Sequence, residues 1–213
     1  MIRKGTIEDA EILSKVEATC FPPNEAATSK EIQERLNVYA NHFLLLFEEE
    51  QLISFLDGFC TNQRDLTDEM YSDASMHDED GDWQMIFGLN TLPDYQRKGY
   101  AAKIMNAMIH MARQEKRKGL VLTCKDRLVP YYSKFGFKNE GVSSSVHGGV
   151  VPNAIGVLNM NIINMVKKYQ KKKKKQAAKE EMKQMIPTLR GQLNEVTSGL
   201  DELNGLLKKI TRS

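Results

Sequence analysis

The segment at residues 96–101 constrains the fold most strongly, because it joins an apolar strand pattern to a helical pattern. The apolar run at 83–89 precedes it, and the helical pattern opens at Ala101. The first N–H groups of a helix have no carbonyl partner inside the helix, and together with the helix dipole they favour a bound phosphate. Gly99 allows the backbone to approach a ligand that a side chain would exclude. The sequence therefore predicts a strand, a glycine turn and a helix N-terminus that bind an anion.

The residues of this segment are Gln96, Arg97, Lys98, Gly99, Tyr100 and Ala101. They match neither the G-x-x-x-x-G-K-[ST] phosphate loop nor the G-x-G-x-x-G spacing of dinucleotide folds. The segment resembles instead the Q/R-x-x-G-x-G/A signature of the GNAT N-acetyltransferases. In that family the loop holds the pyrophosphate of acetyl-coenzyme A, so the resemblance implies that these six residues bind this co-substrate.

Two further segments resemble the same family. Residues 128–137 are similar to the family's A-x-x-x-Y-x-x-x-G-F element, with Tyr132 at the tyrosine position. Residues 2–10 resemble the family's first strand and helix start, and Thr6 and Asp9 have the spacing of a capping box there. The glycine segment and residues 128–137 stand in the order and at the separation that the family shows.

The resemblance spans about residues 1–163 and implies an α/β (α+β) GNAT fold. We expect a mixed, mostly antiparallel central sheet of six to seven strands flanked by helices, with a C-terminal helical heptad tail. Charge divides the chain in a similar way. Residues 165–213 carry 13 Lys and Arg against 5 Asp and Glu, a net charge of +8. Because the whole chain has a net charge of +2, residues 1–164 have a net charge of −6. The predicted units are a GNAT acetyltransferase domain at 1–164, a basic linker at 165–181 and an amphipathic helical tail at 182–213.

Periodicity predicts the elements of the first unit. Helical patterns cover 8–20, 28–40, 100–117 and 128–134, and strand patterns cover 43–47, 52–59, 83–91, 119–124, 138–145 and 150–163. The pair Pro22 and Pro23 ends the first helix, and Pro152 weakens the start of the last strand. The interval 65–82 holds eight carboxylates and no Lys or Arg, which predicts a loop with at most one short helix.

The composition excludes some classes of protein. No run of about eighteen apolar residues occurs, and the charged start lacks the apolar stretch of a secretory signal, so we expect no membrane span. Cys20, Cys60 and Cys124 are odd in number and far apart. This predicts reduced thiols in a cytoplasmic protein, with neither a disulfide nor a metal site.

The tail carries a lysine-rich stretch at 167–175, followed by a heptad pattern. The apolar positions alternate at spacings of four and three, and they are Met182, Ile186, Leu189, Leu193, Val196, Leu200, Leu203, Leu207 and Ile210. Pro187 interrupts the pattern, so we expect the continuous helix to begin there. The apolar seam predicts a homodimer, a helical partner or packing on its own domain. Lysine runs without aromatic residues are a weak signal for nucleic acid, which we do not expect as a partner.

The resemblance implies roles for individual residues. We expect the pyrophosphate of acetyl-coenzyme A on the backbone N–H groups of the glycine turn, with Arg97 and Lys98 adding positive charge. The pantetheine arm is expected to pair with the preceding strand beside Leu89 and Thr91. Tyr132 is the expected general acid, which protonates the departing thiolate; the alternative is an aromatic residue that only packs.

Within the family the likeness is to the arylalkylamine (serotonin-type) branch, judged from residues 20–27 and 128–132. The animal enzymes of that branch carry a His-x-His pair on the central strand, which relays the proton of the amine. Met85 and Phe87 stand at the matching positions. The group that accepts the amine proton is therefore left open by the sequence.

Candidates for this base are His147 and Glu25, a chain of water molecules, or an amine that arrives neutral. Phe21, Pro22 and Pro23 belong to a stiff loop that is expected to wall the acceptor site. We therefore assign these three residues, with Glu25 and His147, to substrate binding.

These expectations define an acyltransferase that moves an acetyl group from acetyl-coenzyme A to a primary amine by direct attack in a ternary complex. The expected acceptor is a small arylalkylamine-like or polyamine-like molecule. Two alternatives stay open: a peptide or protein N-acetyltransferase, and a coenzyme A-binding interaction module that works through its basic helical tail. The acidic interval 65–82 either steers a cationic amine to the site or forms a solvated loop.

Overall fold

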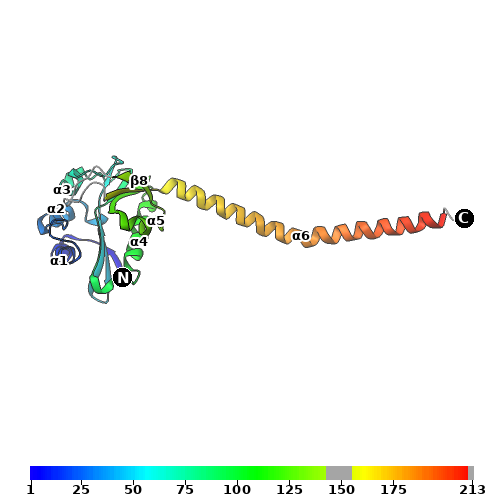
Figure 1. Cartoon of the computed structure of the whole chain (residues 1–213), viewed down its shortest axis with the longest axis horizontal. Helices are drawn as coiled ribbons and strands as arrows, with labels where there is room; N and C mark the ends of the chain where they lie inside the picture. The colour runs from blue at the N-terminus through cyan, green and yellow to red at the C-terminus, as the bar shows by residue number, and fades with distance from the viewer. Residues whose placement is uncertain (143–154, 211–213) are drawn as a thin grey trace. The chain divides into compact units, whose positions relative to one another are not determined.

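The computed structural model describes residues 1–142 and 155–210, with side chains described for residues 1–141, 170–205, 207 and 208. Contacts between residues divide the chain into two units, Met1–Ile163 and Asn164–Ser213. The first unit combines strands and helices (Figure 1).

Two sheets form the framework of the first unit. One sheet has the strand order β1 (Ile2–Lys4), β2 (Leu44–Glu48), β3 (Gln51–Asp57) and β6 (Gly88–Thr91), and the other has β4 (Cys60–Thr61), β5 (Trp83–Ile86), β7 (Gly119–Lys125), β9 (Ile155–Asn161) and β8 (Lys138–Val142). Among the described pairs, β5 and β7 are parallel and the others are antiparallel. The expected mixed, mostly antiparallel arrangement is confirmed, although it is divided into sheets of four and five strands.

The division arises because the strand predicted at 83–91 breaks at Phe87. β5 pairs with β4 and β7, whereas β6 pairs with β3. The Phe87 N–H donates to the carbonyl of Asp57 at 2.9 Å. Gly88 follows, and a Cβ at that position would lie only 2.7 Å from the Asp57 carboxylate, so a larger residue would not fit. The two sheets separate beyond this point, and the described residues place no strand beside β6 on the side away from β3.

Helices cover both faces of the first sheet (Figure 1). α1 (Ala10–Cys20) and α2 (Ser29–Tyr39) lie on one side, and α4 (Tyr100–Gln114) lies on the other. α3 (Glu69–Ser72) and α5 (Val129–Ser133) are short. Single 3₁₀ turns occupy Ile7–Asp9, Ala40–His42, Ala74–Met76, Pro93–Tyr95 and Asp126–Leu128.

Local side-chain chemistry explains where these helices begin and end. The Thr28 hydroxyl accepts the Glu31 N–H at 3.2 Å, and the Glu31 carboxylate accepts the Thr28 N–H at 2.7 Å, which forms a capping box at the start of α2. The capping box predicted for Thr6 and Asp9 is also present, and it begins a 3₁₀ turn. α1 ends at Cys20, before the two prolines, as predicted.

The core lies between α1, α2 and the sheets. Its fully or almost fully buried side chains include Leu13, Ile32, Leu36, Tyr39, Phe43, Leu45, Phe55, Phe59, Met70, Met85 and Val121. Burial of each large apolar side chain contributes about 1.5–3 kcal/mol, so this cluster supplies much of the driving force that fixes α1 and α2 on the sheet.

Most of the predicted elements are confirmed with small shifts at their ends. The helix expected at 100–117 ends at Gln114, and Lys116 beyond it has a φ of 61°, which a right-handed helix cannot continue. Within the strand expected at 150–163 the structure describes β9, and the next helix begins at Ile162. Residues 143–154 lie outside the described residues, and the expectations for that stretch stay predictions.

The described part of the second unit belongs to one helix, α6 (Ile162–Ile210). The prediction that the continuous helix begins at Pro187 is wrong, because α6 contains this proline and the lysine-rich stretch before it. Lys, Gln, Glu and Ala make up most of residues 165–181 and have high helix propensity, so the segment expected to be a linker is helical. Pro187 removes one backbone hydrogen bond without ending the helix. Among the helices of residues 1–142 and 155–210, none has the combined length and apolar character needed to cross a bilayer.

Candidate functional site

A cavity of about 340 Å³ opens beside Phe87, where β5 and β6 separate. Its walls come from α1 and the loop that follows it, from the β5–β6 junction, and from the end of β7 with α5. Five residues that the sequence assigns to the site line this cavity together: Phe21, Pro22, Glu25, Leu89 and Tyr132. The fold thus brings predicted acceptor, donor and catalytic positions into one hollow.

Other predicted site residues lie outside the cavity wall. Residues 96–99 form the turn that precedes α4, Tyr100 and Ala101 are the first residues of that helix, and Thr91 is buried within β6. Pro23 is exposed in the loop after α1. His147 lies outside the described residues, so its assignment stays a prediction.

The glycine turn has the backbone that an anion site needs. Gly99 is the N-cap of α4 with φ of 90° and ψ of 0°, a left-handed conformation that favours glycine. It is exposed, and a Cβ built there would meet no atom within 4 Å. The N–H groups of the first turn of α4 therefore begin at an open surface with no capping side chain. Arg97 and Lys98 beside it are exposed.

The open edge of β6 presents one of the two predicted backbone positions to the cavity. The Leu92 N–H donates to the carbonyl of Ile53 in β3, and alternate residues along the strand face the same way. Leu89 and Thr91 therefore turn their backbone groups away from β3. The Thr91 carbonyl already accepts the Gln96 side-chain amide at 3.1 Å, whereas Leu89 lines the cavity.

A buried acid that sequence reasoning missed faces this cavity. Glu17 on α1 is only 6 % exposed, and its Oε1 accepts the Ala27 N–H at 3.1 Å. Burial and the nearby charge of Asp57 raise the pKa of Glu17 to about 7. The carboxyl can therefore both release and accept a proton near neutral pH.

A signal for Glu17 was present in the sequence. It stands four residues after Leu13 and three before Cys20, which places it on the apolar face of the helix predicted at 8–20. An ionisable residue on a buried face is a candidate for a perturbed pKa.

The other two acids that line the cavity are ion-paired. The Asp57 carboxylate accepts the Arg35 guanidinium at 2.9 Å, and both side chains are buried. Glu25 accepts the Lys125 ammonium at 2.9 and 3.0 Å. Glu25 therefore lies at the wall where it was expected, but its carboxylate forms an ion pair with Lys125. Within the described residues, Glu17 is the lining acid for which the structure shows no ion pair.

Burial also sets the protonation of three other lining groups. It raises the pKa of Tyr132, which is 8 % exposed, so that this phenol keeps its proton at neutral pH. It also raises the pKa of Cys20 and of Cys124 to about 11. Both cysteines are free, as the sequence predicts, and they are neutral thiols rather than thiolates.

Comparison with known proteins identifies the family of this chain. Residues 9–151 match the family described as "Acetyltransferase (GNAT) domain", and the chain belongs to this family. The chain is 26% identical over 145 residues to the serotonin N-acetyltransferase of Mesocricetus auratus, a match that covers 59% of this chain and 69% of that protein.

Solved structures show the same fold. The loading GNATL domain of CurA from Lyngbya majuscula superposes with a TM-score of 0.68 at 17% identity, over 77% of this chain and 98% of that one. The PaiA N-acetyltransferase from Thermoplasma acidophilum, solved with coenzyme A, gives 0.56 at 15% identity over 76% and 98%. The expected GNAT fold is confirmed, and the chain is therefore an acyltransferase by family.

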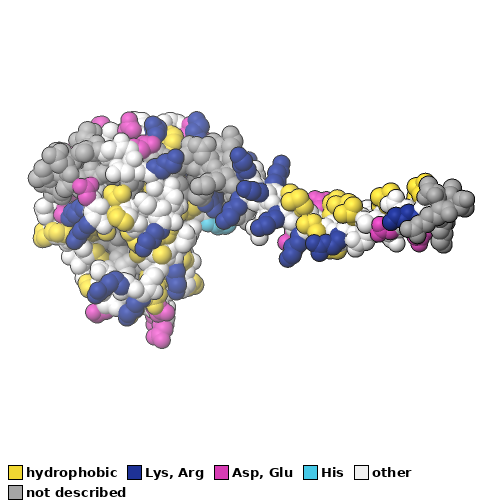
Figure 2. All heavy atoms as spheres, turned by 45° about the vertical axis from the view of Figure 1, so that its right-hand side comes forward, with side chains coloured by type: hydrophobic (Ala, Val, Ile, Leu, Met, Phe, Trp, Pro, Cys, Tyr) yellow, Lys and Arg dark blue, Asp and Glu magenta, His cyan; other side chains and the backbone are white. Residues whose placement is uncertain are grey.

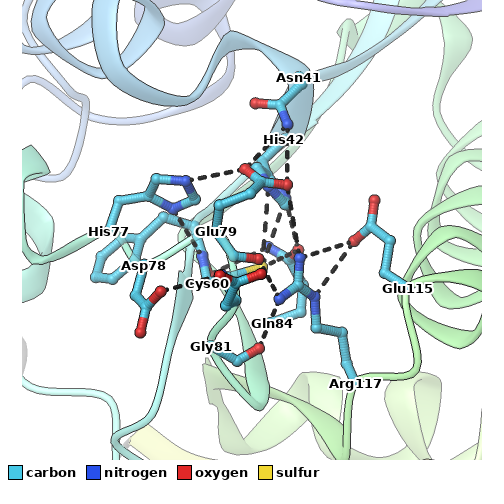
Figure 3. A network of polar contacts seen from close by, with 12 residues as sticks. Asn41, His42, Cys60, His77, Asp78, Glu79, Gly81, Gln84, Glu115 and Arg117 are labelled. Atoms are coloured by element: carbon cyan, nitrogen blue, oxygen red, sulfur yellow. Dashed lines mark hydrogen bonds and ion pairs between the residues drawn. The ribbon is translucent and has the colours of Figure 1, made fainter.

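A second polar cluster, the His42 network, fixes the acidic interval to the body of the domain (Figure 3). His42 is fully buried, with Nδ1 at 2.9 Å from the Gln84 side-chain oxygen and Nε2 at 3.1 Å from a Glu79 oxygen. His77 Nε2 lies 3.2 Å from the same Glu79 oxygen. Arg117 donates to the carbonyls of Glu79 and Gly81, both at 2.6 Å.

The arrangement of this network favours hydrogen bonding over metal binding. Ligand atoms of His42, His77 and Glu79 lie within 4.8 Å of one another, which is close enough for a shared ion. However, His77 Nδ1 accepts the Cys60 N–H at 3.2 Å, so the proton of the neutral ring sits on Nε2 and points at Glu79. A metal would need the Nε2 lone pair instead. The expectation of no metal stays a prediction.

The acidic interval is thus a structured loop with the one short helix that was predicted. Several of its carboxylates are engaged locally: Asp82 with Lys118 at 2.6 Å, Asp78 with Asn62 at 2.7 Å, and Glu79 in the His42 network. Lys118 and Arg117, which form ion pairs with Asp82 and Glu79, offset part of the negative charge that could steer a cation over long range.

We predict that Glu79→Gln destabilises the domain by about 1 kcal/mol at pH 7. Burial raises the pKa of Glu79, but hydrogen bonds from Asn41 and His42 outweigh this and lower it to about 2. A carboxyl with a lowered native pKa stabilises the fold above its unfolded pKa, and this contribution is lost as the pH falls toward 2. Urea unfolding should therefore show a difference between variant and parent that shrinks from pH 5 to pH 2.5. The exposed Asp80→Asn on the same loop is the control, and a difference independent of pH would contradict the account.

Proposed function

We propose that this protein transfers the acetyl group of acetyl-coenzyme A to the primary amine of a small arylalkylamine-like or polyamine-like acceptor, by direct attack in a ternary complex. The observation that carries this proposal is the buried carboxyl of Glu17, which lines the same cavity as Tyr132 and has a pKa near 7. Membership of the acetyltransferase family supports the donor, and the similarity to a serotonin N-acetyltransferase supports an amine acceptor.

The donor would bind along β6 and the glycine turn. The exposed N-terminus of α4 would hold the pyrophosphate on its N–H groups, with Arg97 and Lys98 supplying positive charge. The backbone groups of Leu89 face away from β3 at the cavity wall, so they would pair with the pantetheine arm. This path leads the thioester toward Tyr132 and Glu17.

The acceptor amine would enter as an ammonium ion next to Glu17. Because Asp57 and Glu25 are already paired with Arg35 and Lys125, the carboxylate of Glu17 is the lining negative charge left for a cation. Glu17 would then take one ammonium proton, which gives a neutral nitrogen that can attack the acetyl carbon. Apolar walls, including Phe21 and Phe87, suit the organic part of a small amine.

The departing sulfur requires a proton when the carbon–nitrogen bond forms and the carbon–sulfur bond breaks. Tyr132 keeps its phenolic proton at neutral pH because it is buried, and it lines the cavity on α5. We assign it as the general acid that converts the leaving thiolate to the thiol of coenzyme A.

Direct transfer is favoured over a route through an acetylated cysteine. Cys20 and Cys124 both line the cavity, so either could in principle take the acetyl group first. The thiolate is the nucleophile, and a pKa of about 11 leaves only about one thiol in ten thousand ionised at pH 7. A neutral amine beside Glu17 is the more competent nucleophile.

A panel of acceptors tests the proposed function. Release of free thiol from acetyl-coenzyme A should be at least about tenfold faster with arylalkylamines or polyamines than with short peptides bearing free N-termini. Release with peptides alone would assign the protein to peptide acetylation. Release with none of them would leave a coenzyme A-binding module.

We predict that Tyr132→Phe lowers kcat by about 10²-fold while the dissociation constant for coenzyme A changes little, because the phenol acts on the leaving group rather than in binding. Tyr131→Phe is the matched control, since it removes a neighbouring hydroxyl from the same helix. Steady-state kinetics and calorimetry provide the two readouts. Turnover that is unchanged in Tyr132→Phe would remove the assignment.

The pH dependence of kcat/KM should report the ionisation of the Glu17 carboxyl. The parent enzyme needs the ionised carboxylate, so kcat/KM for a cationic amine should rise up to about pH 7 and then level off. Glu17→Gln should reduce the plateau by about 10²-fold and shift the rise to the pKa of the free amine, because only neutral amine can then react. Glu25→Gln, on the same wall, should keep the rise near pH 7. A Glu17→Gln profile that keeps the parental rise would show that another group is the base.

A further inference from the structure

The heptad seam of α6 is an uncovered apolar face. Its members from Met182 to Leu203 are each between 51 and 65 % exposed, and they are Met182, Ile186, Leu189, Leu193, Val196, Leu200 and Leu203. Figure 2 shows yellow side chains recurring along this helix, after the part where dark blue lysines gather. A row of large apolar residues on one stripe is the pattern of a surface that another helix covers.

The helix also needs a partner for its own stability. Pro187 lies inside it, and Gly191, Gly199 and Gly205 have no atom within 4 Å of where a Cβ would stand. An interior proline costs about 3 kcal/mol and each glycine about 1 kcal/mol relative to alanine. Packing of the seam must therefore supply the free energy that the helix lacks when it is isolated.

We propose that the seam of α6 pairs with the same seam of a second copy of this chain, in an antiparallel two-stranded coiled coil. The positions that flank the seam between Met182 and Gly205 carry only two charges, Lys183 and Arg190. Flanking charges normally select a partner of opposite charge. No acidic residue flanks this seam, so nothing on it would select a basic helix. When two copies of the seam pair in antiparallel orientation, no two like charges lie beside each other.

In the heptad repeat of this seam, Ile186 and Leu193 occupy the apolar position called a, and Val196 and Leu203 occupy the apolar position called d. The antiparallel alignment that sets each a position against a d position of the partner places Ile186 opposite Leu203 and Leu193 opposite Val196. In this register Lys183 of one copy lies beside Asn204 of the other, and Arg190 of one copy lies beside Thr197 of the other. Neither basic residue meets another base.

Repulsion between the lysine runs at 171–175 of the two copies favours the antiparallel orientation. Lys171–Lys175 are exposed in α6, only seven residues before Met182. A parallel pair would hold two such runs about 10 Å apart, which is about one Debye length, so ten positive charges would repel one another. In the antiparallel register the two runs lie at opposite ends of the paired seams, so the length of the seam separates them.

The mass of the full chain tests the pairing. Sedimentation equilibrium at micromolar concentration should give about 48 kDa, twice the 24.2 kDa of one chain. Leu200→Asp places a charge in the seam and should return the mass to that of one chain. Ser198→Asp adds the same charge to the outer face of the helix and should leave the dimer intact. A monomeric parent, a mass above two chains, or a Leu200→Asp variant that still dimerises would overturn the proposal.

Cross-linking with a short bifunctional maleimide tests the orientation. In the antiparallel pair two Ile186→Cys residues lie about 26 Å apart, whereas Ile186→Cys of one chain meets Leu203→Cys of the other. The double variant should therefore give a 186–203 cross-link between chains, identified by mass spectrometry, with the parent protein as the blank for its native cysteines. A 186–186 cross-link in the single variant, or no 186–203 cross-link in the double variant, would contradict antiparallel pairing.

Discussion

The break in one strand at Phe87 is the constraint on which the site depends. On one side of the break, β5 is held between β4 and β7; on the other, β3 is the strand that pairs with β6 among the described residues. The same stretch of chain cannot remain in both sheets, so the sheets separate and the edge of β6 is left open. Gly88 makes the close approach to Asp57 possible at this point. The cavity lies at this division, and the backbone groups of Leu89 face away from β3 beside it.

Burial then decides the chemistry of the groups that surround the opening. Burial of the phenol of Tyr132 and of the thiols of Cys20 and Cys124 raises their pKa values, so their neutral forms are favoured. Arg35 and Lys125 compensate two of the carboxylates. Glu17 is the lining carboxylate for which the described residues show no ion pair. Its pKa of about 7 is suited to accepting a proton from a substrate. In the proposed mechanism, desolvation therefore leaves Tyr132 able to donate a proton and Glu17 able to accept one.

Much of the fold follows from local patterns that the sequence displays. The glycine turn, the capping box at Thr6 and the helix around Tyr132 involve residues within a few positions of one another, and each is predicted correctly. The break at Phe87 was not predicted, because it results from competition between β3 and β7 for one strand. The Arg35–Asp57 pair joins residues 22 positions apart. The raised pKa of Glu17 depends on its burial in the folded domain and, after that, on the charge of the distant Asp57. Pro187 misled the helix prediction, because the strong helix formers before it outweigh its local cost.

The central claim is that the opening beside β6 receives the thioester and directs it to Glu17 and Tyr132. A crystal structure of the full chain with acetyl-coenzyme A bound tests it most directly. The account predicts density for the pyrophosphate at the N-terminus of α4, for the pantetheine arm beside Leu89, and for the sulfur within hydrogen-bond reach of the Tyr132 hydroxyl. An empty cavity at saturating ligand, or a thioester sulfur directed away from Tyr132, would contradict it.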